Sequence, residues 1–248
     1  MIRLMIGLMG SGKSASMVRE MILNDDGKTT FSNIVMKTKN KKFVQISRDM
    51  IFIKKEVENS RGKKEIKTFL NVEFWKTIHD KYPDGINVVI DEAHTLMNSR
   101  RAMSGDNVIM NDFMALLRRI LGDSGDGYGE LILITQLGRK LDVNARELST
   151  SIHYHRCHYK RVCNKCNFSF WETNEIYDKP KHCPACGNRH MRKESFVIEK
   201  WEFANMDECD MFLDNNIKCY KKHYYITDIE KYFKYYDTYQ WTNLISEY

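Results

Sequence analysis

Short apolar runs alternate with amphipathic segments along the first 135 residues. Runs rich in Ile, Val and Leu predict strands at 2–6, 31–37, 86–90 and 130–135. Apolar residues at helical spacing predict helices at 14–24, 71–82 and 106–121. An alternating order of strands and helices is typical of an α/β fold with a mostly parallel central sheet.

Two stretches interrupt this alternation. Residues 39–70 are rich in Lys and Glu and contain short alternating runs, which predict either a hairpin or an insertion that becomes ordered on binding. Residues 122–129 read G-D-S-G-D-G-Y-G, a composition typical of a flexible loop.

Polar and apolar residues alternate again at 151–162 and 195–203, which predicts the two strands of an antiparallel pair. We therefore expect an α/β core at 1–150 and a strand pair at 151–203 that carries a small ribbon at 163–190. Residues 204–248 are expected to form a C-terminal helical or tail segment that completes the core.

The first predicted strand leads directly into G-x-x-x-x-G-K-S at 7–14. In this motif glycines let backbone N–H groups surround a polyphosphate, Lys13 reaches the β- and γ-phosphates, and Ser14 is a ligand for Mg²⁺. The motif predicts a site for ATP or GTP. The expected nucleotide contacts come from Gly7, Gly10, Ser11, Gly12, Lys13, Ser14 and Ala15.

An acidic pair, Asp91 and Glu92, follows the apolar run at 86–90. The carboxyl end of a parallel strand is where an α/β sheet presents residues to its ligand. We expect Asp91 to hold Mg²⁺, usually through water. Glu92 is expected to orient or deprotonate the water that attacks the γ-phosphate.

Two further polar residues are candidates for the same chemistry. Gln136 follows the strand at 130–135 and is expected to contact the γ-phosphate or its water. Arg146 is a candidate to complete the site of a neighbouring subunit, because an arginine supplied in this way stabilises charge during phosphoryl transfer. Arg100, Arg101 and Arg139 are alternatives for that role. Alternatively, Arg146 is a surface residue at the start of a helix and has no catalytic role.

Four of the seven cysteines form two C-x-x-C pairs separated by 16 residues. The pairs are Cys163 with Cys166 and Cys183 with Cys186, and Gly187 supplies the left-handed residue that such a turn needs. Four sulfur ligands are typical of a closed, structural Zn²⁺ site. The other three cysteines, which are Cys157, Cys209 and Cys219, are expected to be buried or chemically idle thiols.

The formal net charge of +6 indicates a polyanionic partner only weakly, because a surplus of this size over 248 residues also suits an ordinary soluble domain. Residues 156–200 hold ten Lys or Arg against five Asp or Glu, with Phe168, Phe170 and Trp171 among them. Basic and aromatic residues together fit a nucleic-acid contact. A stability clip or a contact with another protein fits the same composition, so both interpretations stay open.

The chain contains no run of 18 or more apolar residues. Its N-terminal apolar stretch leads into the phosphate-binding motif, which argues against a signal peptide. We therefore expect a soluble, cytoplasmic protein without membrane insertion.

The motifs at 7–14, 88–94 and 134–136, together with the segment that contains Asp142 and Arg146, resemble the Zot-like branch of the FtsK/HerA family. This branch includes filamentous-phage assembly ATPases and viral genome-packaging ATPases. The resemblance covers roughly residues 1–160. The late sequence Y-Y-D-T-Y at 235–239 resembles a tail found in the same proteins.

The resemblance implies a RecA-like core that assembles into a homo-oligomeric ring and threads DNA through its centre. It assigns Lys13, Ser14, Asp91, Glu92 and Gln136 the roles given above, with an arginine from the next subunit. Unlike the filamentous-phage members, this sequence lacks a transmembrane segment, which favours genome packaging over a membrane-embedded assembly role. We expect the DNA to be double-stranded and the protein to act in a host cytoplasm. A capsid or portal-like protein is then the expected partner.

Two other functions remain as alternatives. The first is an assembly or replication-associated scaffold that uses ATP as a switch. The second is a small-molecule kinase, because zinc-lid adenylate kinases combine a similar phosphate loop with two C-x-x-C pairs. Glu92 argues against the kinase, which has no need to activate water, and the D-G-F-P-R sequence of such kinases is absent.

Overall fold

The computed structural model describes residues 1–23, 26–38, 42–58, 62–97, 105–121, 129–136, 138, 141–175 and 180–241. Its first elements are β1 (Ile2–Ile6), α1 (Lys13–Leu23), β2 (Thr29–Ser32), β3 (Ile34–Met36), β4 (Phe43–Gln45), α2 (Arg48–Ile51), β5 (Phe52–Glu58), β6 (Lys64–Leu70), α3 (Val72–Lys81), β7 (Ile86–Ile90), the 3₁₀ turn η1 (Ala93–Thr95) and α4 (Gly105–Ile120). They are followed by β8 (Leu131–Ile134), α5 (Val143–Glu147), β9 (Ser151–Cys163), β10 (Ser169–Thr173), β11 (Met191–Phe203), α6 (Met206–Asn215), β12 (Lys222–Ile226), the 3₁₀ turn η4 (Ile229–Tyr235) and β13 (Tyr236–Trp241).

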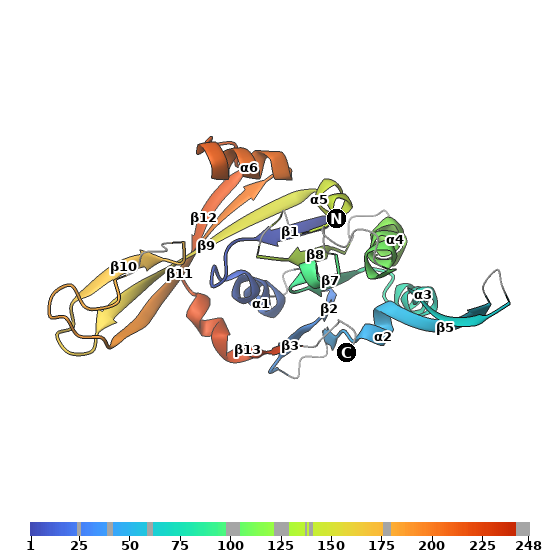
Figure 1. Ribbon diagram of the computed structural model, residues 1–248, viewed down its shortest axis with the longest axis horizontal. Coiled ribbons are helices and arrows are strands. Elements are labelled where there is room, and N and C mark those ends of the chain that lie inside the picture. Colours follow the sequence, from blue (N-terminus) through green and yellow to red (C-terminus); the bar gives the residue numbers. More distant parts are fainter. Residues whose placement is uncertain are drawn as a thin grey trace.

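The central sheet has the strand order β12-β11-β9-β1-β8-β7-β2-β4 (Figure 1). The strands from β9 to β4 are parallel to their neighbours, whereas β11 pairs antiparallel with both β9 and β12. The predicted α/β fold with a mostly parallel sheet is therefore confirmed. Because β8 lies between β1 and β7, the ends of three strands meet at one edge of the sheet.

Different elements cover the two faces of the sheet. Leu4 packs on one face in a buried cluster with Trp75 of α3 and Phe113 of α4. Met5 faces the other side and belongs to a cluster that contains Val18 of α1. Burial on both faces explains why the central strands are short, continuous apolar runs without polar alternation.

The structure refines two sequence predictions in the first half of the chain. The run predicted as one strand at 31–37 divides into β2 and β3 at Asn33. Within 39–70, β5 and β6 pair antiparallel with Phe52 opposite Leu70, so the hairpin interpretation is confirmed. The loop predicted at 122–129 lies, except for Gly129, outside the described residues.

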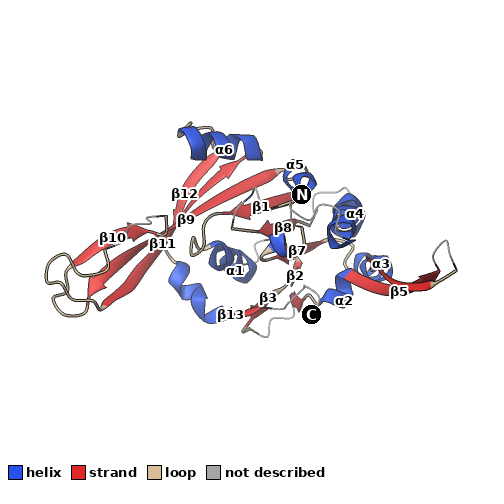
Figure 2. Ribbon diagram, in the orientation of Figure 1, coloured by secondary structure: helices blue, strands red, loops and turns tan. Residues whose placement is uncertain are grey.

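Strands β9 and β11 form the predicted antiparallel pair, and β11 begins four residues earlier than expected, at Met191. Their register shifts between Glu194 and Val197, where Ser195 has a left-handed backbone with φ of 56°. The outer parts of both strands, with β10, project from the core (Figure 2). We call this projection, residues 157–175 and 180–196, the arm.

The chain returns to the core after the arm. Strand β12 extends the sheet beside β11, and η4 then packs against α1. The last described strand, β13, pairs with β3. Within the described part of the chain, no helix has the length and apolar character needed to cross a membrane.

Candidate functional site

The loop between β1 and α1 needs glycine at specific positions. Gly7 and Gly12 have φ of 147° and 87°, a backbone conformation that favours glycine, and a side chain at either would meet a close neighbour. A Cβ at Gly7 would lie 2.4 Å from the carbonyl oxygen of His155, and one at Gly12 would lie 2.4 Å from Cδ1 of Ile198. The loop is therefore packed directly against β9 and β11.

Lys13 is the first residue of α1 and is 8% exposed. Its ammonium donates hydrogen bonds to the carbonyl oxygens of Gly7, at 2.7 Å, and Leu8, at 3.1 Å, and to Ser11 Oγ, at 3.2 Å. Burial lowers the pKa of Lys13 to about 8, although the carboxylates of Asp91 and Glu92 oppose the shift. The loop thus holds the cation where a polyphosphate on the backbone N–H groups would meet it.

A hydrogen bond between Ser14 and Asp91 joins the phosphate loop to the end of β7. Ser14 Oγ donates a 2.7 Å hydrogen bond to Oδ2 of Asp91, and burial raises the pKa of this carboxyl. A hydroxyl and a carboxylate side by side are oxygen donors of the kind that Mg²⁺ prefers. These two residues could therefore hold the Mg²⁺ of a bound nucleotide.

The adjacent Glu92 lies in a left-handed conformation, with φ of 52°. Its Oε1 accepts a 3.2 Å hydrogen bond from Nε2 of Gln136, and its Oε2 lies 3.2 Å from Nδ1 of His94. Thr135 Oγ1 contacts the same His94 nitrogen at 3.3 Å. The carboxylate expected to act on water is therefore positioned by residues from the ends of β7 and β8.

Asn33 is a site residue that the sequence interpretation missed. Its side chain accepts a 2.7 Å hydrogen bond from the backbone N–H of Asp91 and donates a 3.0 Å hydrogen bond to the carbonyl oxygen of the same residue. Asn33 thus holds the backbone from which the acidic pair projects. His94 and Thr135 were also missed; both lie beside residues that the motifs did identify.

A cavity of about 580 Å³ extends from the phosphate loop, within the size range usual for ligand sites. A second cavity of about 440 Å³ shares Ser14, Asp91, Glu92 and Gln136 with it and reaches Asn33 and His94. The residues predicted to contact phosphate, metal or water that line these cavities all lie at the carboxyl edge of the sheet. Their roles in binding and catalysis stay predictions.

Arg146 lies elsewhere. It belongs to α5, which leads into β9, and Thr150 N donates to the carbonyl oxygen of Ile2 at the amino end of β1. In Figure 1 α5 is likewise beside the N-terminus. Arg146 lines neither cavity, and its Nε is buried without a hydrogen-bond partner among the described residues. The alternatives Arg100, Arg101 and Arg139 fall outside the described residues.

The four paired cysteines meet at the tip of the arm, with their sulfur atoms all within 4.8 Å of one another. Cys163 lies 3.6 Å from Cys186, and Cys166 lies 3.6 Å from Cys183, measured between sulfurs. Tetrahedral Zn²⁺ with Zn–S bonds of about 2.3 Å requires sulfurs about 3.8 Å apart. The cluster could therefore hold Zn²⁺ with little rearrangement.

The two cysteine turns have the same backbone form. Gly187 has φ of 69°, as expected, and Asn167 takes the equivalent left-handed position after the first pair, with φ of 57°. Asn188 Nδ2 and Lys165 N both lie within hydrogen-bond range of Cys163 Sγ, at 3.6 and 3.4 Å. Such donors stabilise a thiolate ligand.

Comparison with known proteins identifies the family. A sequence model described as zonular occludens toxin (Zot) matches residues 1–182. A search of curated proteins gives no match. Solved structures similar to this chain include the N-terminal domain of zonular occludens toxin from Neisseria meningitidis, with 17% identity, a TM-score of 0.49, and coverage of 95% of this chain and 98% of that one.

The genome packaging NTPase B204 of Sulfolobus turreted icosahedral virus 2, in complex with ATP-gammaS, is also similar, with 17% identity and a TM-score of 0.39. That match covers 62% of this chain and 74% of the viral protein. The family match extends over most of the sequence and includes the phosphate loop and the acidic pair, as the motif resemblance implied. The chain belongs to the zonular occludens toxin (Zot) family.

Proposed function

We propose that this protein is an ATP-hydrolysing motor that moves double-stranded DNA, and that it serves viral genome packaging. The observation that carries ATP hydrolysis, the first part of the proposal, is the position of Glu92. Its carboxylate is held by Gln136 beside the Ser14–Asp91 pair, at the edge of the sheet that also presents the phosphate loop. A site of this form suits transfer of a phosphoryl group to water.

Each residue of the site has a distinct task in this reaction. Lys13 and the loop N–H groups bind the phosphates, and Glu92 accepts the proton of the attacking water. Gln136 fixes the carboxylate and lines the same cavity, where it would contact the water or the γ-phosphate. Mg²⁺ bound between Ser14 and Asp91 would neutralise charge on the phosphates.

The position of Arg146 supports an oligomeric ring. An arginine at the amino end of the sheet is remote from the phosphate loop of its own subunit, which follows the carboxyl end of β1. In a head-to-tail ring the amino side of one subunit can face the nucleotide of the next. We propose that Arg146 stabilises the transition state of the neighbouring site in this way.

The arm supports a contact with DNA. Among the described residues of the arm, the exposed cations are Lys165, Lys181, Arg189, Arg192 and Lys193. Two large aromatic side chains are exposed near them, Phe168 at 41% and Trp171 at 56%. Cations that neutralise phosphates give affinity for any DNA sequence, as a translocating motor requires.

The proposal is tested by the steady-state rate of ATP hydrolysis with and without double-stranded DNA, measured together with the mass of the oligomer. We expect DNA to increase the rate several-fold in a ring-sized assembly. A slow rate that DNA leaves unchanged, with a protein partner bound only in the ATP state, would instead support the nucleotide-switched scaffold. Transfer of phosphate to a small molecule in preference to water would support the kinase.

A further inference from the structure

The cavity beside the phosphate loop has two chemically different ends. One end contains the residues that would meet phosphates and metal, among them Lys13, Ser14 and Asp91. The rest of the lining includes apolar and aromatic side chains, among them Tyr159, Phe196, Ile198, Ile229 and Phe233. The proposed reaction uses the first end and leaves the second without a role.

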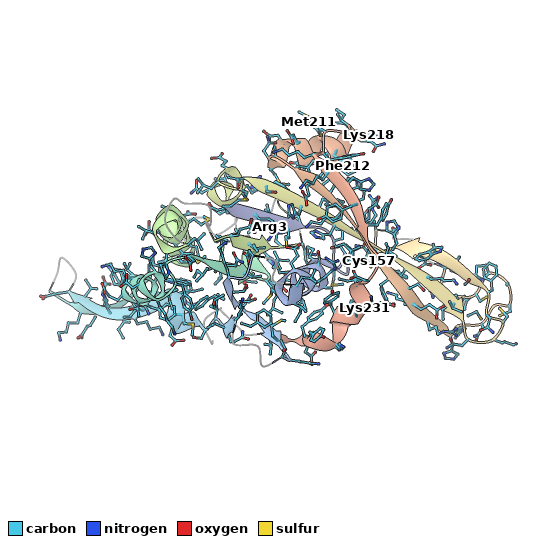
Figure 3. The ribbon with its side chains drawn as sticks, turned by 180° about the vertical axis from the view of Figure 1, so that it is seen from behind. Arg3, Cys157, Met211, Phe212, Lys218 and Lys231 are labelled. Atoms are coloured by element: carbon cyan, nitrogen blue, oxygen red, sulfur yellow. The ribbon has the colours of Figure 1, made fainter. Side chains whose placement is uncertain are left out.

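Two strands and one 3₁₀ turn, which are distant from one another in sequence, form the apolar end. Tyr159 and Phe196 come from the root of the arm, where β9 and β11 leave the core, and Phe233 comes from η4. In Figure 3 Cys157 marks this junction of arm and core, and Lys231 marks η4 close to it. The backbone N–H of Phe196 donates a 3.2 Å hydrogen bond to Oε1 of Glu230, which fastens the arm root to η4.

The aromatic rings form a connected group. Phe196 meets Phe233 edge to face, with ring centres 5.5 Å apart, and meets Tyr159 at 6.1 Å. The ammonium of Lys193 lies 4.3 Å from the centre of the Tyr159 ring. Phe196 is half-buried, whereas Phe233 is 38% exposed. Ring surface is therefore available at the cavity wall.

The apolar end begins directly beside the phosphate loop. The side chain of Ile198 packs closely on Gly12, and Ala15 of α1 lines the same cavity. The side-chain amide of Asn174 also lies within 3.5 Å of the carbonyl oxygen of Met9 in the loop. A ligand whose phosphates lie on the loop would extend its remaining part along this wall.

We propose that Tyr159, Phe196, Ile198, Ile229 and Phe233 form the subsite for the nucleobase of the bound nucleotide. This inference rests on the proposed nucleotide site. A planar base stacks favourably on aromatic side chains, and such stacking tolerates different bases because each has a π face. The arm root and η4 together enclose the base, so the nucleotide contacts the arm as well as the core.

The experiment compares ATP with inorganic tripolyphosphate, which has the same phosphates but no base. Dissociation constants of both, with Mg²⁺, are measured for the native protein, for Phe233→Ala and for Phe196→Leu. We expect Phe233→Ala to weaken ATP binding about tenfold, as loss of one stacking partner does, and to leave tripolyphosphate binding unchanged. Phe168→Ala, at the arm tip, is the matched control and should change neither constant.

The outcomes separate the subsite from the proposed function. Equal loss of both ligands in the Phe233 and Phe196 variants, or unchanged ATP binding in both, would overturn the base subsite. If the native protein binds neither ATP nor tripolyphosphate, the proposed function fails and the subsite fails with it. Phe233→Trp provides a second check, because a larger ring should preserve ATP affinity if stacking is the interaction.

Discussion

Asn33 and Asp91 are joined by two hydrogen bonds, one in each direction, between the side-chain amide of Asn33 and the backbone of Asp91. The residues are 58 positions apart in the chain and come from the ends of neighbouring strands β2 and β7. The amide therefore fixes the backbone that carries both Asp91 and Glu92. The acidic pair owes its geometry to a residue outside every motif.

Replacement of Asn33 by Ala should lower both stability and turnover. It removes the partners of two backbone groups, at a cost in the free energy of unfolding of about 2 kcal/mol. It also releases the peptide that positions Glu92, so we expect kcat to fall about tenfold or more. Chemical denaturation and steady-state kinetics measure the two effects.

Asn87→Ala is the matched control for this substitution. Asn87 lies on β7, the strand that leads to Asp91, and its side chain accepts a 3.0 Å hydrogen bond from Glu130 N and donates one of 2.7 Å to Asp26. We expect the control to lower stability without changing kcat. A loss of kcat in Asn87→Ala as large as that in Asn33→Ala would show that the Asn33 effect is general destabilisation.

The lowered pKa of Lys13 gives nucleotide binding a dependence on pH. Phosphate anions favour the protonated ammonium, so affinity should be highest below the pKa of about 8 and fall as pH rises through it. Phosphate groups, with a second pKa of about 6, are already ionised in this range and add no trend. Titration of ATP binding between about pH 7 and 10 measures the fall, which approaches tenfold per pH unit.

Lys193→Met should show the same pH profile as the native protein, because the ammonium of Lys193 lies 4.3 Å from the centre of the Tyr159 ring, in the part of the cavity assigned to the base. Affinity that stays constant to the end of the titration would contradict the assignment of the buried cation to phosphate binding.

The cysteine cluster should bind one Zn²⁺ and stabilise the tip of the arm. Metal binding by four thiolates supplies folding free energy to the part of the chain that it closes. Chelation or Cys166→Ser should therefore unfold residues 163–190 and leave the core folded, as measured by proteolysis and by the thermal unfolding of the core. Cys219→Ser, outside the cluster, should retain the metal. Elemental analysis without zinc, or full zinc content in Cys166→Ser, would exclude the site.

The proposed ring can be tested by mixing two inactive variants. Arg146→Ala should bind ATP normally but not hydrolyse it, because the arginine acts on transition-state charge. Lys13→Ala should lose binding. In a mixed ring some intact Lys13 sites meet an intact Arg146 of the next subunit, so part of the activity should return. No recovery in an oligomer shown to contain both chains would mean that Arg146 acts within its own subunit or is structural.

The sequence predicted those parts of the protein that depend on local pattern. Gly7 to Ser14 form a motif with fixed spacing, and the apolar strand before Asp91 indicates its place in a parallel sheet. Asn33 could not be found in this way, because its role depends on β2 lying beside β7. Its one local signal was a polar residue within a run that we predicted to be a continuous strand.

The aromatic residues of the proposed base subsite could not be predicted from the sequence, for a related reason. Tyr159, Phe196 and Phe233 are separated by 37 residues in each interval. They meet because β9 pairs with β11 at the root of the arm and η4 packs against β11. In sequence they resemble ordinary core or surface aromatics. The left-handed backbone of Glu92 is also unexpected, because it is unusual for a residue other than glycine, asparagine or aspartate.

The most direct test of a DNA-moving motor is displacement of a third strand from a DNA triplex, measured with the native protein and with Glu92→Gln. The variant should bind ATP normally and hydrolyse it at least about 100-fold more slowly, because it lacks the base that activates water. We expect the native protein to displace the third strand only when ATP is present, and Glu92→Gln to displace none. A native protein that hydrolyses ATP and binds the duplex, yet leaves the third strand in place, would contradict the account.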